Sequence, residues 1–220
     1  MTHEFDYFRH HRIGLPECVY CEGKDLRVLE RLLAELVRKK SHPVLLTKLS
    51  EKKHASLKPA ISKKLDYDAL SKTAYLHGTF PPLGPKAPVV AVVTAGSSDV
   101  AVAAEAVRTL RFLGIESRLF PDIGVAALWR LEKHLSAINA CGVVIAAAGM
   151  DAAIVPVLGG LTARPLIAVP TSVGYGVAQG GVTALHSMLA GCSPGVTVVN
   201  IDNGYGAACA AFRILKEMRQ

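Results

Sequence analysis

The part of the chain after residue 88 alternates short apolar segments with longer amphipathic ones, and this alternation limits the possible folds more than any other feature. The apolar segments are rich in β-branched residues, and four of the five are apolar on both faces of a strand. They span residues 89–94, 117–120, 142–147, 166–169 and 196–201. Helices are expected near 99–113, 124–137, 150–161, 176–190 and 206–219. Five strand–helix repeats predict an α/β domain of three αβα layers around a mainly parallel sheet.

The first 80 residues differ in composition and are expected to form a small basic α+β domain. Residues 1–87 hold 16 Lys and Arg against 10 Asp and Glu, whereas residues 88–220 hold 9 against 8, so +6 of the formal charge of +7 lies before residue 88. A helix is predicted over 25–39 and a strand over 44–47, followed by a Lys-rich segment. Four prolines in residues 81–88 predict a linker, which leaves 89–220 as the flavodoxin-like domain.

Charge and composition narrow the classes of function. Residues 165–201 contain no Asp, Glu, Lys or Arg, but Pro and Gly interrupt this run so often that buried interior is expected rather than a membrane span. Residues 1–12 have no apolar core of the kind that a secretory signal needs, so a cytoplasmic location with free thiols is expected for the five cysteines. The Lys-rich segment is either an ordinary solvated face or a guide for an anionic ligand, and the sequence has no nucleic-acid-binding motif.

Small and polar residues follow all five predicted strands, in loops where a parallel sheet binds ligands. Ligands bind beyond the carboxyl ends of such strands, because the loops open there and the helix N-termini direct their amides outward. The binding candidates in these loops are Gly96, Ser97, Ser98, Asp122, Gly149, Met150, Pro170, Thr171, Ser172, Gly174, Tyr175, Gly176, Asn200, Asp202, Asn203 and Gly204. Residues 96–99 are interpreted as a backbone-amide cradle for phosphate, although they lack a Walker lysine and a G-x-G-x-x-G pattern.

Each loop taken alone also has a simpler interpretation as turn and cap chemistry. Ser98 or Asp99 could cap the following helix, and Gly149 and Gly174 could occupy positions with positive φ. Asp151 stands where a helix is expected to begin, so it could equally be an N-cap.

Three further loop side chains each have a structural and a ligand-binding interpretation. Asp202 and Asn203 could fix a tight turn or bind ribose hydroxyls, and Tyr175 could stack on a ring or pack against the protein. Met150 is expected to form a wall of the site rather than to take part in chemistry.

Several of these loops carry a resemblance to a known family. Residues 94–99, 148–150, 168–176 and 192–204 resemble the LarB family, the pyridinium-3,5-biscarboxylic acid mononucleotide synthases, and residues 12–24 extend the similarity towards the N-terminus. The resemblance implies a C-terminal domain related to the aminoimidazole ribonucleotide carboxylases of purine synthesis. It also implies carboxylation of the pyridinium ring of nicotinic acid adenine dinucleotide by CO₂ or bicarbonate, with hydrolysis of the phosphoanhydride and release of AMP. The product is the first intermediate of the nickel-pincer nucleotide cofactor.

The resemblance also implies residue roles and an assembly. It makes Cys192 the nucleophile and matches Asp151 to the family's acidic position, and Asp99 completes the catalytic candidates. It implies a homo-oligomer, an octamer by analogy with the related carboxylases, with no covalently bound cofactor and with Mg²⁺ on the anhydride as the one plausible metal. The sequence departs from the family pattern at two positions: Asp151 stands where a Glu is expected, and Trp129 stands where a His is expected before Arg130.

The chemistry explains why a thiol is needed. A pyridinium ring is electron-poor, so its C5 attacks CO₂ only after a thiolate has added to the ring and made C5 the carbon end of an enamine. A base must then take the C5 proton before the thiolate leaves.

The position of the thiol raises a difficulty. Cys192 precedes the fifth strand, so within one chain it should lie at the opposite end of the sheet from the loops, whereas Cys209 in the first turn of the last helix is at the loop end. We therefore expect a neighbouring subunit to donate Cys192. Cys141 is expected in the core, and Cys18 and Cys21 with His10 and His11 nearby are a weak candidate for a zinc site.

Rival functions on the same scaffold are an aminoimidazole ribonucleotide carboxylase or mutase and a nucleotide-binding module without catalysis. The sequence around Asp122 lacks the Ser-Ala-His-Arg expected of the former. A flavodoxin-like electron carrier is disfavoured by the positive charge and by the lack of aromatic residues placed to enclose a flavin.

Overall fold

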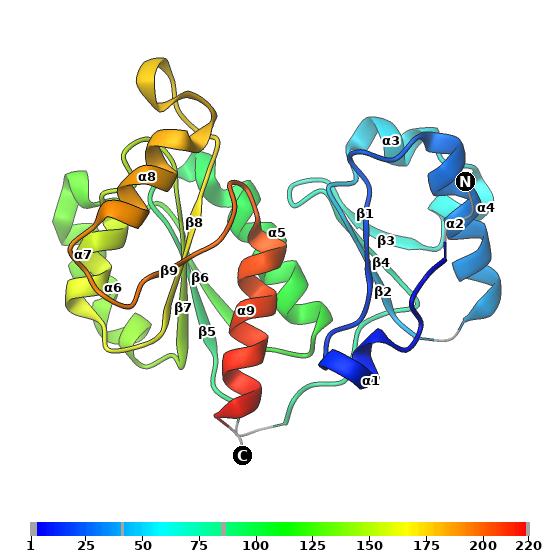
Figure 1. Ribbon diagram of the computed structural model, residues 1–220, viewed down its shortest axis with the longest axis horizontal. Helices are drawn as coiled ribbons and strands as arrows, with labels where there is room; N and C mark the ends of the chain where they lie inside the picture. Colours follow the sequence, from blue (N-terminus) through cyan, green and yellow to red (C-terminus); the bar gives the residue numbers. More distant parts are fainter. Residues whose placement is uncertain (1–3, 41, 85–86, 219–220) are drawn as a thin grey trace. The chain divides into compact units, whose positions relative to one another are not determined.

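The computed structural model describes residues 4–40, 42–84 and 87–218 and divides the chain into two compact units, Met1–Pro81 and Pro82–Gln220 (Figure 1). The division falls in the Pro-rich segment, of which residues 85–86 lie outside the described residues. Each unit has its own cluster of buried apolar side chains, so each is described by itself.

The N-terminal unit is an α+β domain with a four-stranded sheet in the order β1-β2-β4-β3. Strands β1 and β2 are parallel, and β4 pairs antiparallel with both β2 and β3. The strands are β1 (Cys18–Tyr20), β2 (Val44–Thr47), β3 (Leu65–Asp68) and β4 (Thr73–Leu76), and the helices are α1 (Arg9–Ile13), α2 (Leu26–Lys39), α3 (Glu51–Ser56) and α4 (Pro59–Ser62).

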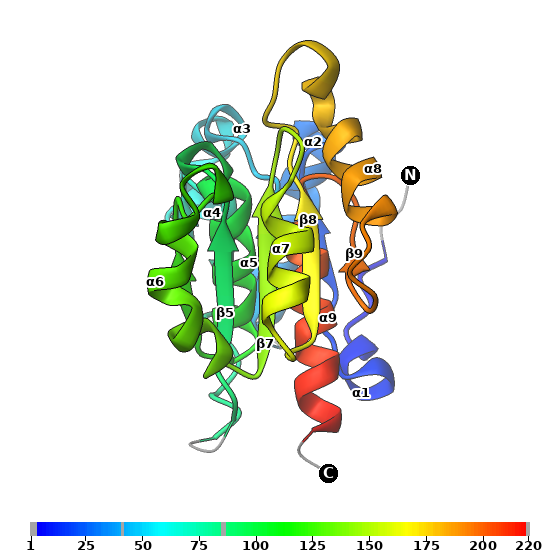
Figure 2. The same cartoon turned by 90° about the vertical axis from the view of Figure 1, so that its left-hand side faces the viewer.

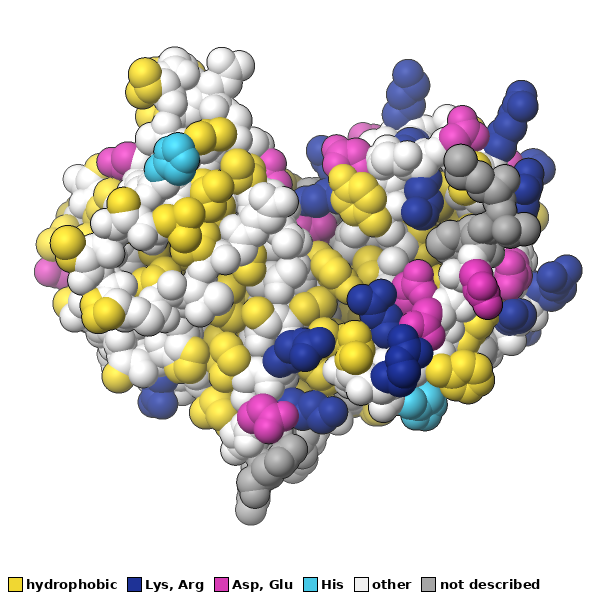
Figure 3. All heavy atoms as spheres, viewed as in Figure 1, with side chains coloured by type: hydrophobic (Ala, Val, Ile, Leu, Met, Phe, Trp, Pro, Cys, Tyr) yellow, Lys and Arg dark blue, Asp and Glu magenta, His cyan; other side chains and the backbone are white. Residues whose placement is uncertain are grey.

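Helix α2 supplies much of the core of this unit because its leucines recur at helical spacing. Leu29, Leu32, Leu33 and Leu36 are buried in one cluster with the strands, while its basic residues face solvent. Lys and Arg side chains are accordingly numerous on the surface of this unit (Figure 3).

The C-terminal unit has the predicted αβα architecture. Its sheet of five parallel strands has the order β6-β5-β7-β8-β9, the doubly wound order in which the first strand lies between the second and the third. The strands are β5 (Val90–Thr94), β6 (Ser117–Phe120), β7 (Val143–Ala148), β8 (Leu166–Pro170) and β9 (Thr197–Val198).

Helices cover both faces of this sheet. Helices α5 (Val100–Phe112) and α9 (Gly204–Glu217) pack together on one face, and α6 (Leu128–Asn139), α7 (Ile154–Leu161) and α8 (Val182–Ala190) lie on the other (Figure 2). Short 3-10 turns precede three of them, at η1 (Ser97–Asp99), η2 (Val125–Ala127) and η3 (Gly176–Gly181). Strands β5, β7 and β8 are buried along their whole length, and because β8 lies within residues 165–201, this charge-free run is partly interior. No helix among the described residues is long and apolar enough to span a membrane.

Some element boundaries differ from the prediction. Strand β9 has two residues instead of six, and the helix expected from 124 begins at Leu128 because η2 comes first. The helix expected over 176–190 is broken where Gly180 and Gly181 take positive φ, so α8 begins only at Val182. Helix α9 begins at Gly204, which puts Cys209 in its second turn rather than in its first.

Candidate active site

A pocket of about 540 Å³ lies at the carboxyl end of the C-terminal sheet, between the loops that follow β5 and β7. These two strands are adjacent although they are first and third in the chain, so their helices leave towards opposite faces and open a crevice between them. Eight of the predicted site residues line this pocket: Gly96, Ser97, Ser98, Asp99, Asp122, Gly149, Met150 and Asp151.

Asp99 forms the wall on the β5 side and holds the loop in place. Its side chain is buried, at 3% exposure, although it is a carboxylate. The backbone N–H of Gly96 donates to Asp99 Oδ2 at 2.9 Å, and the Thr171 hydroxyl donates to Asp99 Oδ1 at 2.6 Å. Asp99 stands at the N-cap position of α5, as its capping interpretation expected, and Ser98 does not. The Asp99 side chain caps the preceding turn η1, through the hydrogen bond from the Gly96 N–H, rather than α5 itself.

The loop after β7 is held by close backbone contacts. A Cβ on Gly149 would lie 2.2 Å from the carbonyl oxygen of Val173 and 2.7 Å from Thr171 Oγ1, so only glycine fits there. Gly149 and Gly174 have ordinary φ values, and the expectation of positive φ at these two positions is wrong; the neighbouring Met150 and Ala152 take it instead. Glycine is needed at 149 for space rather than for backbone conformation.

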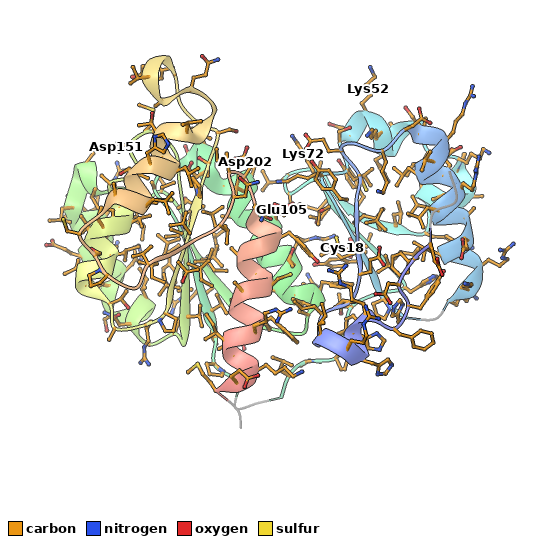
Figure 4. The ribbon with its side chains drawn as sticks, viewed as in Figure 1. Cys18, Lys52, Lys72, Glu105, Asp151 and Asp202 are labelled. Atoms are coloured by element: carbon orange, nitrogen blue, oxygen red, sulfur yellow. The ribbon has the colours of Figure 1, made fainter. Side chains whose placement is uncertain are left out.

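Asp151 is exposed on this loop, and Figure 4 shows it at the end of the unit where β7 and β8 finish. Its Oδ1 accepts a hydrogen bond from the N–H of Ala153 at 3.3 Å. Helix α7 begins at Ile154 with Ala153 as its N-cap, so Asp151 is not the N-cap. Its carboxylate is available to a ligand in the pocket.

Asp122 completes the lining on the β6 side. Its N–H donates to Thr94 Oγ1 at 2.9 Å, which ties the loop after β6 to the end of β5. Its carboxylate forms an ion pair with Arg130, with 3.3 Å between Oδ2 and the guanidinium nitrogen. The lining thus contains three carboxylates and no Lys, Arg, His or aromatic side chain.

The loop after β8 contributes Val173 to the lining of the pocket, and the loop after β9 contributes no lining residue. The Ser172 N–H donates to Asp202 Oδ1 at 2.8 Å, and the Asn203 side chain caps α9 by accepting from the N–H of Gly206. Tyr175 is 77% exposed, so it does not pack against the described protein. Pro170, Thr171, Gly174, Gly176, Asn200 and Gly204 belong to the same two loops or to the residues that end them.

Cys192 does not line the pocket of its own chain. It is exposed in the loop between α8 and β9, where the next residue, Ser193, donates from its hydroxyl to the Pro156 carbonyl of α7 at 2.7 Å. Of the other cysteines, Cys141 is buried in the core as predicted, and burial raises the pKa of its thiol. Within the described residues, no group of three or more His, Cys, Asp or Glu side chains is arranged to hold a metal ion.

Comparison with known proteins agrees with this architecture. Residues 89–220 match the family model described as AIR carboxylase, and residues 2–78 match the one described as LarB/PurE-like N-terminal domain. The chain belongs to the LarB family. An uncharacterised protein of Methanocaldococcus jannaschii is 35% identical over 99% of this LarB-family chain and 85% of its own length.

A second relative from the same organism covers the C-terminal unit. It is named N5-carboxyaminoimidazole ribonucleotide mutase and is 32% identical over 132 residues, which are 58% of this chain and 78% of the relative. Together the two domains of this LarB-family chain indicate an enzyme with carboxylase- or mutase-type activity.

Sequence reasoning did not find two features of the site. The residues Val125 and Ala126 of η2 line the pocket, and Arg130 pairs with one of its carboxylates. The position of Arg130 one helical turn after η2, near the end of β6, is the signal that could have indicated its role.

Proposed function

We propose that this protein carboxylates the pyridinium ring of nicotinic acid adenine dinucleotide at C5 and hydrolyses its phosphoanhydride. The products are pyridinium-3,5-biscarboxylic acid mononucleotide and AMP, and the reaction is the first step of nickel-pincer cofactor synthesis. The observation that carries this proposal is the charge of the pocket. Of the three carboxylates in the lining, Asp99 is buried and hydrogen-bonded and Asp122 is paired with Arg130, so Asp151 is the one that can face the positively charged ring nitrogen. Opposite charges attract strongly in a partly desolvated site.

In the proposed mechanism, the thiolate of Cys192 forms a C–S bond to the ring, and the displaced electron pair makes C5 an enamine carbon. C5 forms a C–C bond to CO₂, and Asp151 takes the C5 proton. The C–S bond then breaks with its electron pair leaving on sulfur as the thiolate, while the lone pair of the ring nitrogen re-forms the ring double bond and restores the aromatic cation. Hydrolysis of the anhydride consumes one water molecule and releases AMP.

Cys192 must reach a pocket that it does not line in its own chain, so we propose that a neighbouring subunit of a homo-oligomer, an octamer, supplies it. The exposure of this thiol on a loop fixed against α7 supports that arrangement, since an ordered loop can present a side chain to a second copy.

Release of AMP and formation of the dicarboxylated mononucleotide from dinucleotide and bicarbonate test the activity. Cys192→Ala should lower turnover by at least about a thousand-fold and leave dinucleotide binding within about twofold, because only the covalent step is lost. Cys209→Ala is the matched control and should keep its activity. Full activity of the Cys192 variant would exclude the covalent mechanism.

Mixing two inactive variants tests the shared site. Cys192→Ala lacks the thiol and Asp151→Asn lacks the base, so co-assembled subunits regain some sites with both groups only if the groups come from different chains. We expect activity to reappear on co-expression and not in mixtures of separately assembled proteins. No recovery on co-expression would place both groups in one chain.

A second candidate function is the mutase reaction on N5-carboxyaminoimidazole ribonucleotide, which the name of the second relative favours. That ligand carries no cationic ring, so the acidic pocket does not favour it. Incubation with aminoimidazole ribonucleotide or its N5-carboxy derivative, in parallel with the dinucleotide, separates the two. Binding of dinucleotide without turnover by the unsubstituted protein would instead indicate a non-catalytic module.

A further inference from the structure

Trp129 is the only tryptophan of the chain, and it lies exposed in the first turn of α6. Its exposed fraction is 63%, and the preceding Leu128 is 45% exposed. A large flat ring in water loses the stabilisation that tryptophan normally gains from burial, so an exposed one often marks a place where a ligand or a partner stacks.

One neighbour in the sequence and one contact connect Trp129 to the rim of the pocket. Ala126, three residues earlier, lines the pocket. The Arg130 guanidinium lies 5.7 Å from the centroid of the indole ring and also pairs with Asp122, which lines the pocket. Arg130 therefore covers one face of the ring, and most of the rest of the ring is accessible.

The side chains that line the pocket offer neither a ring for a nucleotide base nor a positive charge for a phosphate. At the rim, Trp129 supplies an aromatic side chain and the adjacent Arg130 supplies a cation.

We propose that Trp129 is the stacking surface for the purine base of the leaving AMP half, while the pyridinium ring enters the acidic pocket. The inference rests on the proposed function, because only a dinucleotide has both rings. Stacking of a base on an aromatic side chain changes affinity by between about fivefold and a hundredfold, so Trp129 would contribute to selection of an adenine dinucleotide over a bare pyridinium mononucleotide.

Because Trp129 is the only tryptophan in the sequence, tryptophan fluorescence reports on this residue alone. Titration of the unsubstituted protein with AMP should quench its fluorescence in a saturable way, and ribose 5-phosphate, which has no base, should not. A protein whose fluorescence does not respond to AMP at any concentration would overturn the inference.

Calorimetric titration of variants gives the second test. Trp129→Leu should weaken AMP binding by about tenfold, Trp129→Phe should recover most of the loss, and Leu128→Ala is the matched control with unchanged affinity. Equal AMP affinity in Trp129→Leu and the unsubstituted protein refutes the inference. So does a change in oligomeric state with AMP affinity unchanged, since Trp129 would then be a contact between copies.

The proposed activity and the proposed stacking role of Trp129 can be refuted independently of one another. If the unsubstituted protein forms the dicarboxylated product and Trp129→Leu has the same KM for dinucleotide, the stacking role is wrong and the activity stands. If no product forms while AMP still quenches Trp129, the activity is wrong and the base-binding surface stands.

Discussion

At the scale of single residues, Asp99 shows that a residue at a candidate site can serve mainly to fix that site. Its two carboxylate oxygens are occupied by the Gly96 N–H and the Thr171 hydroxyl. It therefore joins the loops after β5 and β8, and its catalytic assignment from the sequence stays a prediction.

Replacement of Asp99 should destabilise the protein. Asp99→Ala leaves the Gly96 N–H and the Thr171 hydroxyl unpaired in a buried position, which we expect to lower the free energy of unfolding by about 2–3 kcal/mol. Urea denaturation measures the change. Asp151→Ala is the control, because that side chain is exposed and should change stability by about 0.5 kcal/mol or less. Equal effects of the two changes would mean that the buried hydrogen bonds contribute little.

Cys21 gives a pH-dependent prediction. Burial raises the pKa of its thiol to about 12, above its ordinary value of 9.0. Above pH 9 the folded state therefore keeps a proton that the unfolded state loses. The contribution of this thiol to the free energy of unfolding is complete below pH 9 and falls by up to about 4 kcal/mol as the pH rises towards 12.

Comparison with Cys21→Ala isolates this contribution from other groups that titrate at high pH. The difference in urea midpoint between the two proteins should shift in favour of the variant between pH 8 and pH 11, about the range over which the unfolded thiol ionises. A difference that does not depend on pH would show that the Cys21 thiol ionises as readily in the folded protein as in the unfolded one.

At the scale of elements, Lys53 joins α3 to the turn between β1 and α2. Its ammonium donates to the carbonyl oxygens of Cys21, Glu22 and Lys24, at 2.6, 2.5 and 2.8 Å. An ammonium has three donors, so all three are used and three carbonyls that belong to no helix or strand are satisfied.

Lys53→Met removes these donors and keeps the length of the side chain. We expect a loss of about 2–3 kcal/mol in the free energy of unfolding, because hydrogen bonds to a charged group are the strong ones. Lys52→Met is the matched control, since Lys52 is exposed on the same helix (Figure 4) and should change stability by about 0.5 kcal/mol or less. The role of Lys53 would be refuted if both variants unfold at the same urea concentration.

The elements that sequence reasoning predicted best are those in which local pattern and burial agree. Strands β5, β7 and β8 are continuous apolar runs and are buried at every position, so their pattern indicated them directly. Strands β1, β3 and β4 were missed because they are three or four residues long, and β3 carries two aspartates. Pairing between strands distant in the sequence, which no local pattern reports, decides such cases.

The candidate site was predictable to the same extent. The alternation of strands and helices predicted a site at the carboxyl ends of the strands, in the five loops that follow them. It did not predict the order of the strands in the sheet, which places the pocket between the loops after β5 and β7. The role of each residue within those loops was not predictable, because it depends on tertiary hydrogen bonds such as that between Thr171 and Asp99. Whether Cys192 reaches a pocket depends on how a second copy of the chain is placed, and the sequence pattern of one chain does not predict that placement.

At the scale of the whole molecule, each unit buries its own apolar cluster and pairs its own strands. A unit with an independent core can fold alone. We therefore expect residues 82–220 expressed alone to unfold cooperatively on heating, with circular dichroism of an αβ protein. The matched fragment from residue 100 lacks β5, the second strand in the sheet order, and should not fold. A non-cooperative transition for residues 82–220 would show that this unit depends on the rest of the chain.

The acidic lining of the pocket has a consequence for the course of the reaction. In the proposed reaction, addition of sulfur would remove the positive charge of the ring nitrogen and with it the attraction to the carboxylates, and expulsion of the sulfur would restore both. The same wall should discriminate against dihydropyridine nucleotides, which lack the positive charge from the outset. Under the proposed function, the lining would therefore favour oxidised over reduced pyridine nucleotides and would also favour the return of the adduct to the aromatic ring.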